Sequence, residues 1–279
     1  MSVTRIVTDS TADLAPEVLE ELGISVVPMR IRLGSDVLVD GPALRTAEFY
    51  HTMAQAGQTP AVLTPTATEF AQVYQRLGRE TSDIVTIACS GGLNGTVRAA
   101  MQGRSGLLGR MSIQVVDSQL TSRALGILVA DAAQAACAGA SGAEVVRLVR
   151  GAISRIYFAF YAESLDYLKR NHLFELPRDP LGGATAVEPL LMIEEGEITA
   201  VQRMRNRGTP VERLFEFVAE FPKVTVVDVL HTGLTPGAEE IKAQVEQLYP
   251  GQVVGEHIIG PVFSAYAGPR CLGVVVRDN

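Results

Sequence analysis

Apolar and polar residues alternate in blocks that predict strands and helices in turn through the first half of this chain. Short runs of β-branched and apolar residues at Val3–Thr8, Ile84–Ala88 and Ile113–Val116 have the length and composition of buried strands. Segments with helical spacing lie between them, including Pro16–Leu22 and Leu120–Cys137. Strands that alternate with helices favour right-handed βαβ units and a largely parallel sheet.

Two further segments of this half carry specific expectations. Ile24–Leu33 has the pattern of a second strand of the sheet. The prolines at positions 60 and 65 predict an extended loop, followed by a helix that Thr66 or Thr68 caps.

The pattern changes near residue 155, after a break of small residues at 139–142. The strands predicted beyond it are less regularly separated by helices, and Glu194–Glu197 has the composition of a hairpin turn between two of them. We therefore expect an N-terminal α/β domain over residues 1–155 and a C-terminal α+β domain over residues 156–279, with a mixed or antiparallel sheet in the second. The strands of this second half are predicted at Ile156–Tyr161, Ala186–Met192, Ile198–Arg203, Val224–Leu230 and Leu272–Arg277.

The most informative stretch follows the strand at Ile84–Ala88. Cys89-Ser90-Gly91-Gly92 permits a sharp turn, and a helix is predicted to begin near Asn94-Gly95-Thr96 with Asn94 as its N-cap. Free N–H groups and the helix dipole make such a turn a candidate anion site. The spacing matches neither a Walker A loop nor a dinucleotide fingerprint, so no nucleotide cofactor is expected.

Composition narrows the function classes. The 279 residues are 47% apolar, which indicates a folded chain with a large core. A net charge of −7 argues against a nucleic-acid partner. The three cysteines have no paired spacing, and we find neither a signal peptide nor an apolar run long enough to span a membrane, so a cytoplasmic location is expected.

Catalytic and metal-binding alternatives are weaker. The four histidines show no ligand spacing, so no metal site is expected. A hydrolase would need Ser90 or Cys89 as the nucleophile, with Asp228 and either His231 or His257 as partners. The Gly-x-Ser-x-Gly elbow is not met, because Ala88 stands at the first glycine position. This alternative stays open only as a remote one.

An ordered set of short motifs along the whole chain resembles the DegV family. The opening segment Ile6–Leu14 matches the signature of that family, and the other matches follow in the expected order: Leu93–Thr96, Val116–Ser118, Leu165–Lys169, His231–Gly233, Ile259–Val262, Gly268-Pro269 and Gly273. The resemblance implies two domains that hold a fatty acid in an apolar tunnel between them, with its carboxylate on hydroxyls of the N-terminal loops. It also implies a binding protein, not an enzyme, that presents acyl chains to a separate fatty acid kinase.

The head-group residues depart from the pattern of that family. Its Thr-Ser-Gln-Pro run is replaced by Val62-Leu63-Thr64-Pro65, its second carboxylate-binding serine by Asn94, and the Arg of its Lys-Gly-Gly-Arg turn is missing at 170–173. We therefore expect a divergent member with an altered polar end. Tyr266 is the candidate replacement for a lost histidine and Arg270 for a lost charge. The full set of candidate lipid-binding residues is Asn94, Leu63, Ser90, Thr64, Thr66, Gly95, Thr96, Tyr266 and Arg270.

Two consequences of these departures remain as hypotheses. The missing Arg predicts weak or absent support of acyl phosphorylation by a kinase. The lost hydroxyls leave a second possibility, a non-catalytic scaffold without a lipid of its own.

Overall fold

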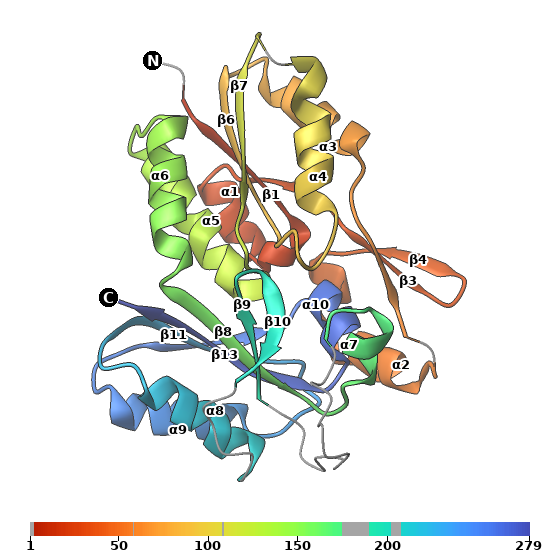
Figure 1. The fold of residues 1–279 in the computed structure, drawn as a ribbon, viewed down its shortest axis with the longest axis vertical. Coiled ribbons are helices and arrows are strands. Elements are labelled where there is room, and N and C mark those ends of the chain that lie inside the picture. Colours follow the sequence, from red (N-terminus) through yellow and green to blue (C-terminus); the bar gives the residue numbers. More distant parts are fainter. Residues whose placement is uncertain (1–2, 58, 108, 175–189, 202–207) are drawn as a thin grey trace, which may run out of the picture.

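The computed structural model describes residues 3–57, 59–107, 109–174, 190–201 and 208–279. Its strands form two main sheets, one in each half of the chain, and a small third sheet beside the first (Figure 1). The expected fold class is confirmed: an N-terminal α/β domain with a parallel sheet and a C-terminal domain with a mixed sheet. The domain boundary at residue 155 stays a prediction. Within the described ranges, no helix has the length and apolar character needed to cross a membrane.

The first sheet has the strand order β2-β1-β6-β7, and its described pairings are parallel. Successive side chains of a strand point to opposite faces of the sheet, and both faces of this sheet carry apolar side chains that helices cover. Ile6 and Val85 belong to one apolar cluster, and Val7 and Ile84 belong to another. In Figure 1, α5 and α6 lie on one side of this sheet and α3 and α4 on the other. The elements are β1 (Arg5–Asp9), α1 (Pro16–Glu21), β2 (Ser25–Val27), α3 (Ala67–Leu77), β6 (Asp83–Ala88), α4 (Thr96–Arg104), β7 (Ser112–Asp117), α5 (Ser122–Cys137) and α6 (Gly142–Ile153).

Two expectations for this half were wrong. Ile24–Leu33 is not one strand: its first part is β2 in the parallel sheet, and its second part is β3 (Arg30–Leu33) in the small antiparallel sheet β4-β3-β5. Pro28, which has no N–H to donate, stands between them. The segment after Pro60 is also not only loop, because Ala61–Leu63 pairs with β3 as β5. The third strand of the small sheet is β4 (Asp36–Val39), and α2 (Ala47–Gln55) follows it.

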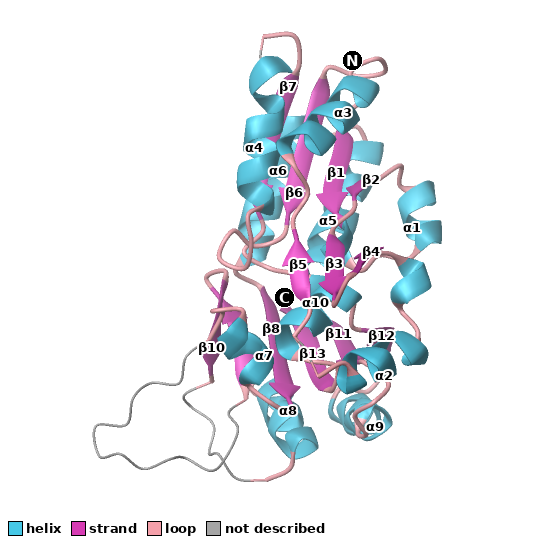
Figure 2. Cartoon of the chain, turned by 90° about the vertical axis from the view of Figure 1, so that its right-hand side faces the viewer, coloured by secondary structure: helices cyan, strands magenta, loops and turns pink. Residues whose placement is uncertain are grey.

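The second sheet has the order β10-β9-β8-β13-β11-β12, with one parallel pairing, between β11 and β12. One face packs against α8 and α9, and the other faces the first domain (Figures 1 and 2). The Glu194–Glu197 turn is confirmed as a hairpin between β9 and β10, whereas residues 186–189, 202 and 203 of the predicted strands lie outside the described residues. The strands are β8 (Ile156–Ala162), β9 (Leu191–Glu194), β10 (Glu197–Ala200), β11 (Val224–His231), β12 (Val254–Ile258) and β13 (Cys271–Asp278), and the helices are α7 (Asp166–Arg170), α8 (Pro210–Ala219), α9 (Ala238–Leu248) and α10 (Pro261–Ala267).

Buried polar contacts join the two domains. The Asp13 carboxylate accepts a hydrogen bond from the Gly260 N–H at 3.0 Å, and it also pairs with Arg45 at 3.1 Å. Arg123 on α5 forms an ion pair with Asp228 on β11, with 2.6 Å between the side-chain atoms. Because these groups are largely withdrawn from water, each partner compensates the desolvation of the other and fixes how the domains meet.

Candidate functional site

The turn between β6 and α4 is held by its own backbone and by neighbouring loops. The Ser90 N–H donates to the Leu120 carbonyl at 2.9 Å, and the Ser90 carbonyl accepts from the N–H groups of Leu93 and Asn94. A Cβ at Gly92 would lie 2.5 Å from the Gly196 carbonyl oxygen, so glycine is required where this turn meets the β9–β10 hairpin. The turn is therefore a rigid platform at the junction of the two domains.

Asn94 connects this turn to the C-terminal domain. Its amide nitrogen donates to the Tyr266 hydroxyl on α10 at 3.3 Å and faces Cys89 Sγ at 3.4 Å, while its Oδ1 accepts from the Thr96 N–H at 3.0 Å. The expectation that Asn94 is the N-cap was wrong by one position, because Gly95 is the N-cap of α4 and has no side chain to cap it. Asn94 precedes the N-cap and still accepts from the N–H of the first helical residue, Thr96. The structure brings together Asn94 and Tyr266, which are 172 positions apart in the chain.

Two of the predicted hydroxyl donors already have protein partners. Ser90 is 1% exposed, and its hydroxyl donates to the Gly196 carbonyl at 2.6 Å. Thr66 caps α3 in a capping box with Glu69, donating to that carboxylate at 2.8 Å and accepting from the Glu69 N–H. A hydroxyl has one proton to donate, so a ligand oxygen would compete with these bonds. Their assignment as lipid-binding residues stays a prediction.

Thr64 and Gly95 lie at the open side of the turn, and Thr96 is buried beneath it. A Cβ at Gly95 would lie 3.8 Å from Thr64 Oγ1, so the Thr64 hydroxyl faces the space over this glycine. Thr96 is fully buried, and its hydroxyl has no hydrogen-bond partner in the part of the chain that the structure describes. Leu63, at the end of β5, is half-buried. A surface hollow of about 660 Å³ opens here, lined by Asn94, Gly95 and the exposed side of α4.

Arg270 lies elsewhere. Its guanidinium pairs with Glu163 at 3.4 Å, and the two side chains are 49% and 58% exposed. It lines a small hollow beside Tyr167 and Pro269, and it does not line the hollow at the turn. The structure therefore separates Arg270 from Asn94 and Tyr266, and the charge expected from Arg270 is not brought to the turn.

Buried acidic and thiol groups underlie the turn. The Asp9 carboxylate accepts from the Cys89 N–H at 2.7 Å and from the Thr11 hydroxyl at 2.5 Å, and burial raises the pKa of Asp9 above its ordinary value. Burial, together with the nearby Asp9, raises the pKa of Cys89 to about 12, so this side chain stays a thiol at neutral pH. Burial also raises the pKa of Tyr266. The Cys89 thiol and the Tyr266 hydroxyl are therefore neutral at pH 7, and Cys89 is poorly suited to act as a nucleophile.

The remaining hydrolase arrangement is only partly assembled. His257 Nε2 lies 3.4 Å from Asp228 Oδ1. Although burial opposes ionisation, His257 and Arg123 hold the pKa of Asp228 below its ordinary value. The Ser90 hydroxyl, however, donates its proton to the Gly196 carbonyl, and among the described residues no hydrogen bond joins it to His257. No group of three potential metal-ligating side chains occurs in the described ranges.

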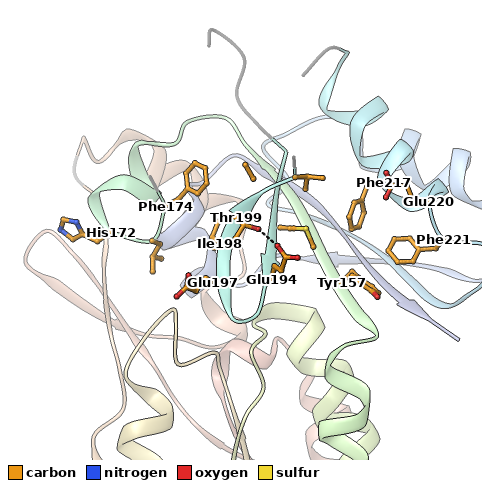
Figure 3. Close-up of a pocket in the computed structure, with 14 residues that line it drawn as sticks. Tyr157, His172, Phe174, Glu194, Glu197, Ile198, Thr199, Phe217, Glu220 and Phe221 are labelled. Atoms are coloured by element: carbon orange, nitrogen blue, oxygen red, sulfur yellow. Dashed lines mark hydrogen bonds between the residues drawn. The ribbon is translucent and has the colours of Figure 1, made fainter. Parts of the chain in front are cut away.

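Sequence reasoning missed a second hollow, which lies over the β9–β10 hairpin. It has a volume of about 890 Å³ and a mixed lining, with aromatic and aliphatic side chains beside exposed carboxylates (Figure 3). Figure 3 shows His172 and Phe174 on one side of the hairpin and Tyr157, Phe217 and Phe221 on the other. No short motif marks this hollow, because its lining comes from four separate segments: residues 157, 172–174, 192–201 and 217–221.

This hollow begins beside the turn at the domain junction. A Cβ at Gly92 would lie 3.2 Å from Cγ of Glu197, which lines the hollow. The interior between the domains is filled by contrast, since Phe158, Phe160 and Phe263 are at most 1% exposed and their ring centroids lie 5.0–5.5 Å apart. The open volume with aromatic side chains next to the turn is thus over the hairpin.

Comparisons with known proteins agree with this architecture. A family model described as "Uncharacterised protein, DegV family" matches residues 3–279. A DegV domain-containing protein of Streptomyces coelicolor is 32% identical over 98% of this chain and 98% of its own length. The fold is similar to that of a DegV family protein from Thermus thermophilus, described by its fatty acid binding, with a TM-score of 0.84, 24% identity and full coverage of both chains. It is also similar to DegV from Bacillus subtilis, described as a fatty acid binding protein, with a TM-score of 0.86, 20% identity and full coverage of both.

Proposed function

Because this chain belongs to the DegV family, we propose that it binds a long-chain fatty acid or a similar amphiphile at the domain junction. The observation that carries this proposal is the Asn94–Tyr266 contact beside the open Thr64–Gly95 surface. Polar groups from both domains meet there beside the hollow over the hairpin, whose lining includes several aromatic rings, and this combination of polar and apolar groups suits an amphiphile.

The polar end of the ligand binds at the turn. The Thr64 hydroxyl, which faces the space over Gly95, is one donor in this proposal. The Asn94 amide is a second, and it would exchange its bonds to Tyr266 and Cys89 for the ligand oxygen. A carboxylate is satisfied by such donors, and the positive end of a helix dipole adds to the attraction. Ser90 and Thr66 act in this proposal as supports of the turn.

The alkyl tail extends into the hollow over the β9–β10 hairpin. Phe174, Ile198, Phe217 and Phe221 provide apolar contacts there. Each buried CH₂ group contributes about 0.8 kcal/mol, so a chain of many carbons supplies most of the binding free energy. A closed tunnel between the domains, as the family resemblance implies, requires the ring cluster of Phe158, Phe160 and Phe263 to move apart.

Within this proposal the protein is a cytoplasmic carrier and not an enzyme. The fatty acid kinase that acts on such carriers is a separate protein, and the head-group contacts of this chain are altered from the family pattern. One observation favours a second function, a scaffold without a lipid: two hydroxyls expected to contact the carboxylate are occupied by Gly196 and Glu69.

The first experiment is extraction of purified protein with a denaturing solvent, followed by mass spectrometry of the extract. A fatty acid or another amphiphile in stoichiometric amount supports the proposal. The delipidated protein is then titrated with oleate. The variant Asn94→Ala is expected to bind oleate several-fold more weakly, while Asn279→Ala, at the exposed C-terminus, serves as the matched control. If no amphiphile is extracted and the protein takes up no oleate, the scaffold function is the better assignment.

A further inference from the structure

Arg98 occupies an unusual position at the candidate head-group site. It is the third residue of α4, it is exposed, and it lines the hollow that Asn94 and Gly95 also line. A Cβ at Gly95 would lie 3.5 Å from Nη2 of Arg98 and 3.8 Å from Oγ1 of Thr64. The guanidinium and the hydroxyl therefore face the same small volume over the turn.

The charge of Arg98 is unfavourable where it stands. At the third position of α3, α6 and α8 the chain has Glu69, Glu144 and Glu212, each in a capping box with the residue before its helix. A negative charge there complements the positive end of the helix dipole, whereas the positive charge of Arg98 opposes it. The first turn of α4 contains no acidic residue.

Arg98 also has no counterion among the residues that the structure describes. In the described ranges its side chain has neither an ion pair nor a hydrogen bond, whereas Arg270 is paired with Glu163. Asp117, which does not line the hollow, accepts hydrogen bonds from the N–H groups of Gly91 and Gln119. An anion over Gly95 would satisfy both the guanidinium and the helix terminus.

We propose that Arg98 is the cationic partner of the ligand's head group and makes the site selective for an ionised carboxylate over a neutral amphiphile of the same chain length. This inference rests on the proposed function. A guanidinium binds a carboxylate through charge-assisted hydrogen bonds, and a hydroxyl head group gains little from the same contact. Arg98 thus supplies at the turn the positive charge that the family resemblance led us to expect from Arg270.

The test compares two ligands that differ only at the polar end. Oleate and oleyl alcohol are titrated by calorimetry into the delipidated full-length protein and into Arg98→Gln, Arg98→Lys and Arg110→Gln. Arg110 is exposed in the loop after α4 and does not line the hollow, so it is a control for the same change in net charge. Circular dichroism and thermal melting verify that each variant is folded.

The expected result is that Arg98→Gln weakens oleate binding about tenfold, leaves oleyl alcohol binding within about twofold, and reduces the dependence of oleate affinity on salt. Arg98→Lys retains part of the affinity and Arg110→Gln retains all of it. If Arg98→Gln binds oleate as tightly as Arg110→Gln, or loses both ligands equally, the role of Arg98 is overturned while lipid binding stands. If the unaltered protein binds neither ligand, the proposed function and this inference both fail.

Discussion

Replacement of Ser90 by alanine separates a structural role of this residue from a ligand-binding role. The Ser90 hydroxyl is buried, it donates to the Gly196 carbonyl at 2.6 Å, and it accepts from the Gly92 N–H at 3.1 Å. Alanine removes both bonds and leaves the Gly196 carbonyl without this donor in a water-poor junction. The cost of such a buried unsatisfied group is about 1–3 kcal/mol.

The measurable consequence is a loss of stability with little loss of affinity. For a chain of this size, about 2 kcal/mol corresponds to a fall in melting temperature of roughly 4–8 °C. Scanning calorimetry measures that fall, with Ser105→Ala as the control, since Ser105 is exposed and its hydroxyl donates only to Met101 in the preceding turn. Oleate affinity of the folded Ser90→Ala variant is expected to stay within about threefold of the unaltered protein.

The opposite pattern would refute this reasoning. If Ser90→Ala melts at the temperature of the unaltered protein and loses oleate binding tenfold or more, the hydroxyl donates to the ligand and not to Gly196. Ser90 would then belong to the head-group site, as the sequence motifs predict.

Three further predictions concern charge, tail and partner. Burial, with the nearby charge of Asp13, raises the pKa of Asp40 to about 7. The unfolded chain therefore releases this proton near pH 4, while the folded chain keeps it to about pH 7. Between these values the free energy of unfolding falls as the pH rises, because the buried Asp40 side chain resists ionisation. Asp40→Asn is expected to stabilise the protein about 2–3 kcal/mol more at pH 8 than at pH 5, as measured by urea titration. Asp36→Asn, at an exposed position, is the control. An equal effect of Asp40→Asn at both pH values would contradict the raised pKa of Asp40. Ala200→Trp places a large ring in the hollow over the hairpin and is expected to weaken binding of an 18-carbon acid more than that of a 10-carbon acid. The control Ala219→Trp, on the exposed side of α8, leaves the affinity for both acids unchanged. Equal loss of affinity for the two acids in Ala200→Trp would contradict the placement of the tail. In a reconstituted assay with a fatty acid kinase we expect weak or absent acyl phosphorylation, and robust turnover would show that the partnership survives the missing Arg at residues 170–173.

The local pattern of the sequence determined most elements and the fold class. Strand β6, its turn and helix α4 follow from a short apolar run and the glycines after it, all within about twenty positions, although the N-cap is Gly95 and not Asn94. The alternation of strands and helices predicted the parallel sheet for the same reason: hydrophobic period and turn residues act over short distances along the chain. Pro28 shows the limit of this logic, since the pattern on both sides of it is that of a strand and only the pairing partners differ.

Only the tertiary structure decided which polar groups meet. The partner of Ser90 is Gly196, 106 positions away, and that of Asn94 is Tyr266, 172 positions away. Both contacts depend on how the C-terminal sheet docks against the first domain, which no local pattern encodes. The same docking leaves Arg270 paired at the surface and Arg98 without a counterion in the described ranges. A side chain's chemical type is legible in the sequence, but its hydrogen-bond partner and its distance from a ligand are set by long-range packing.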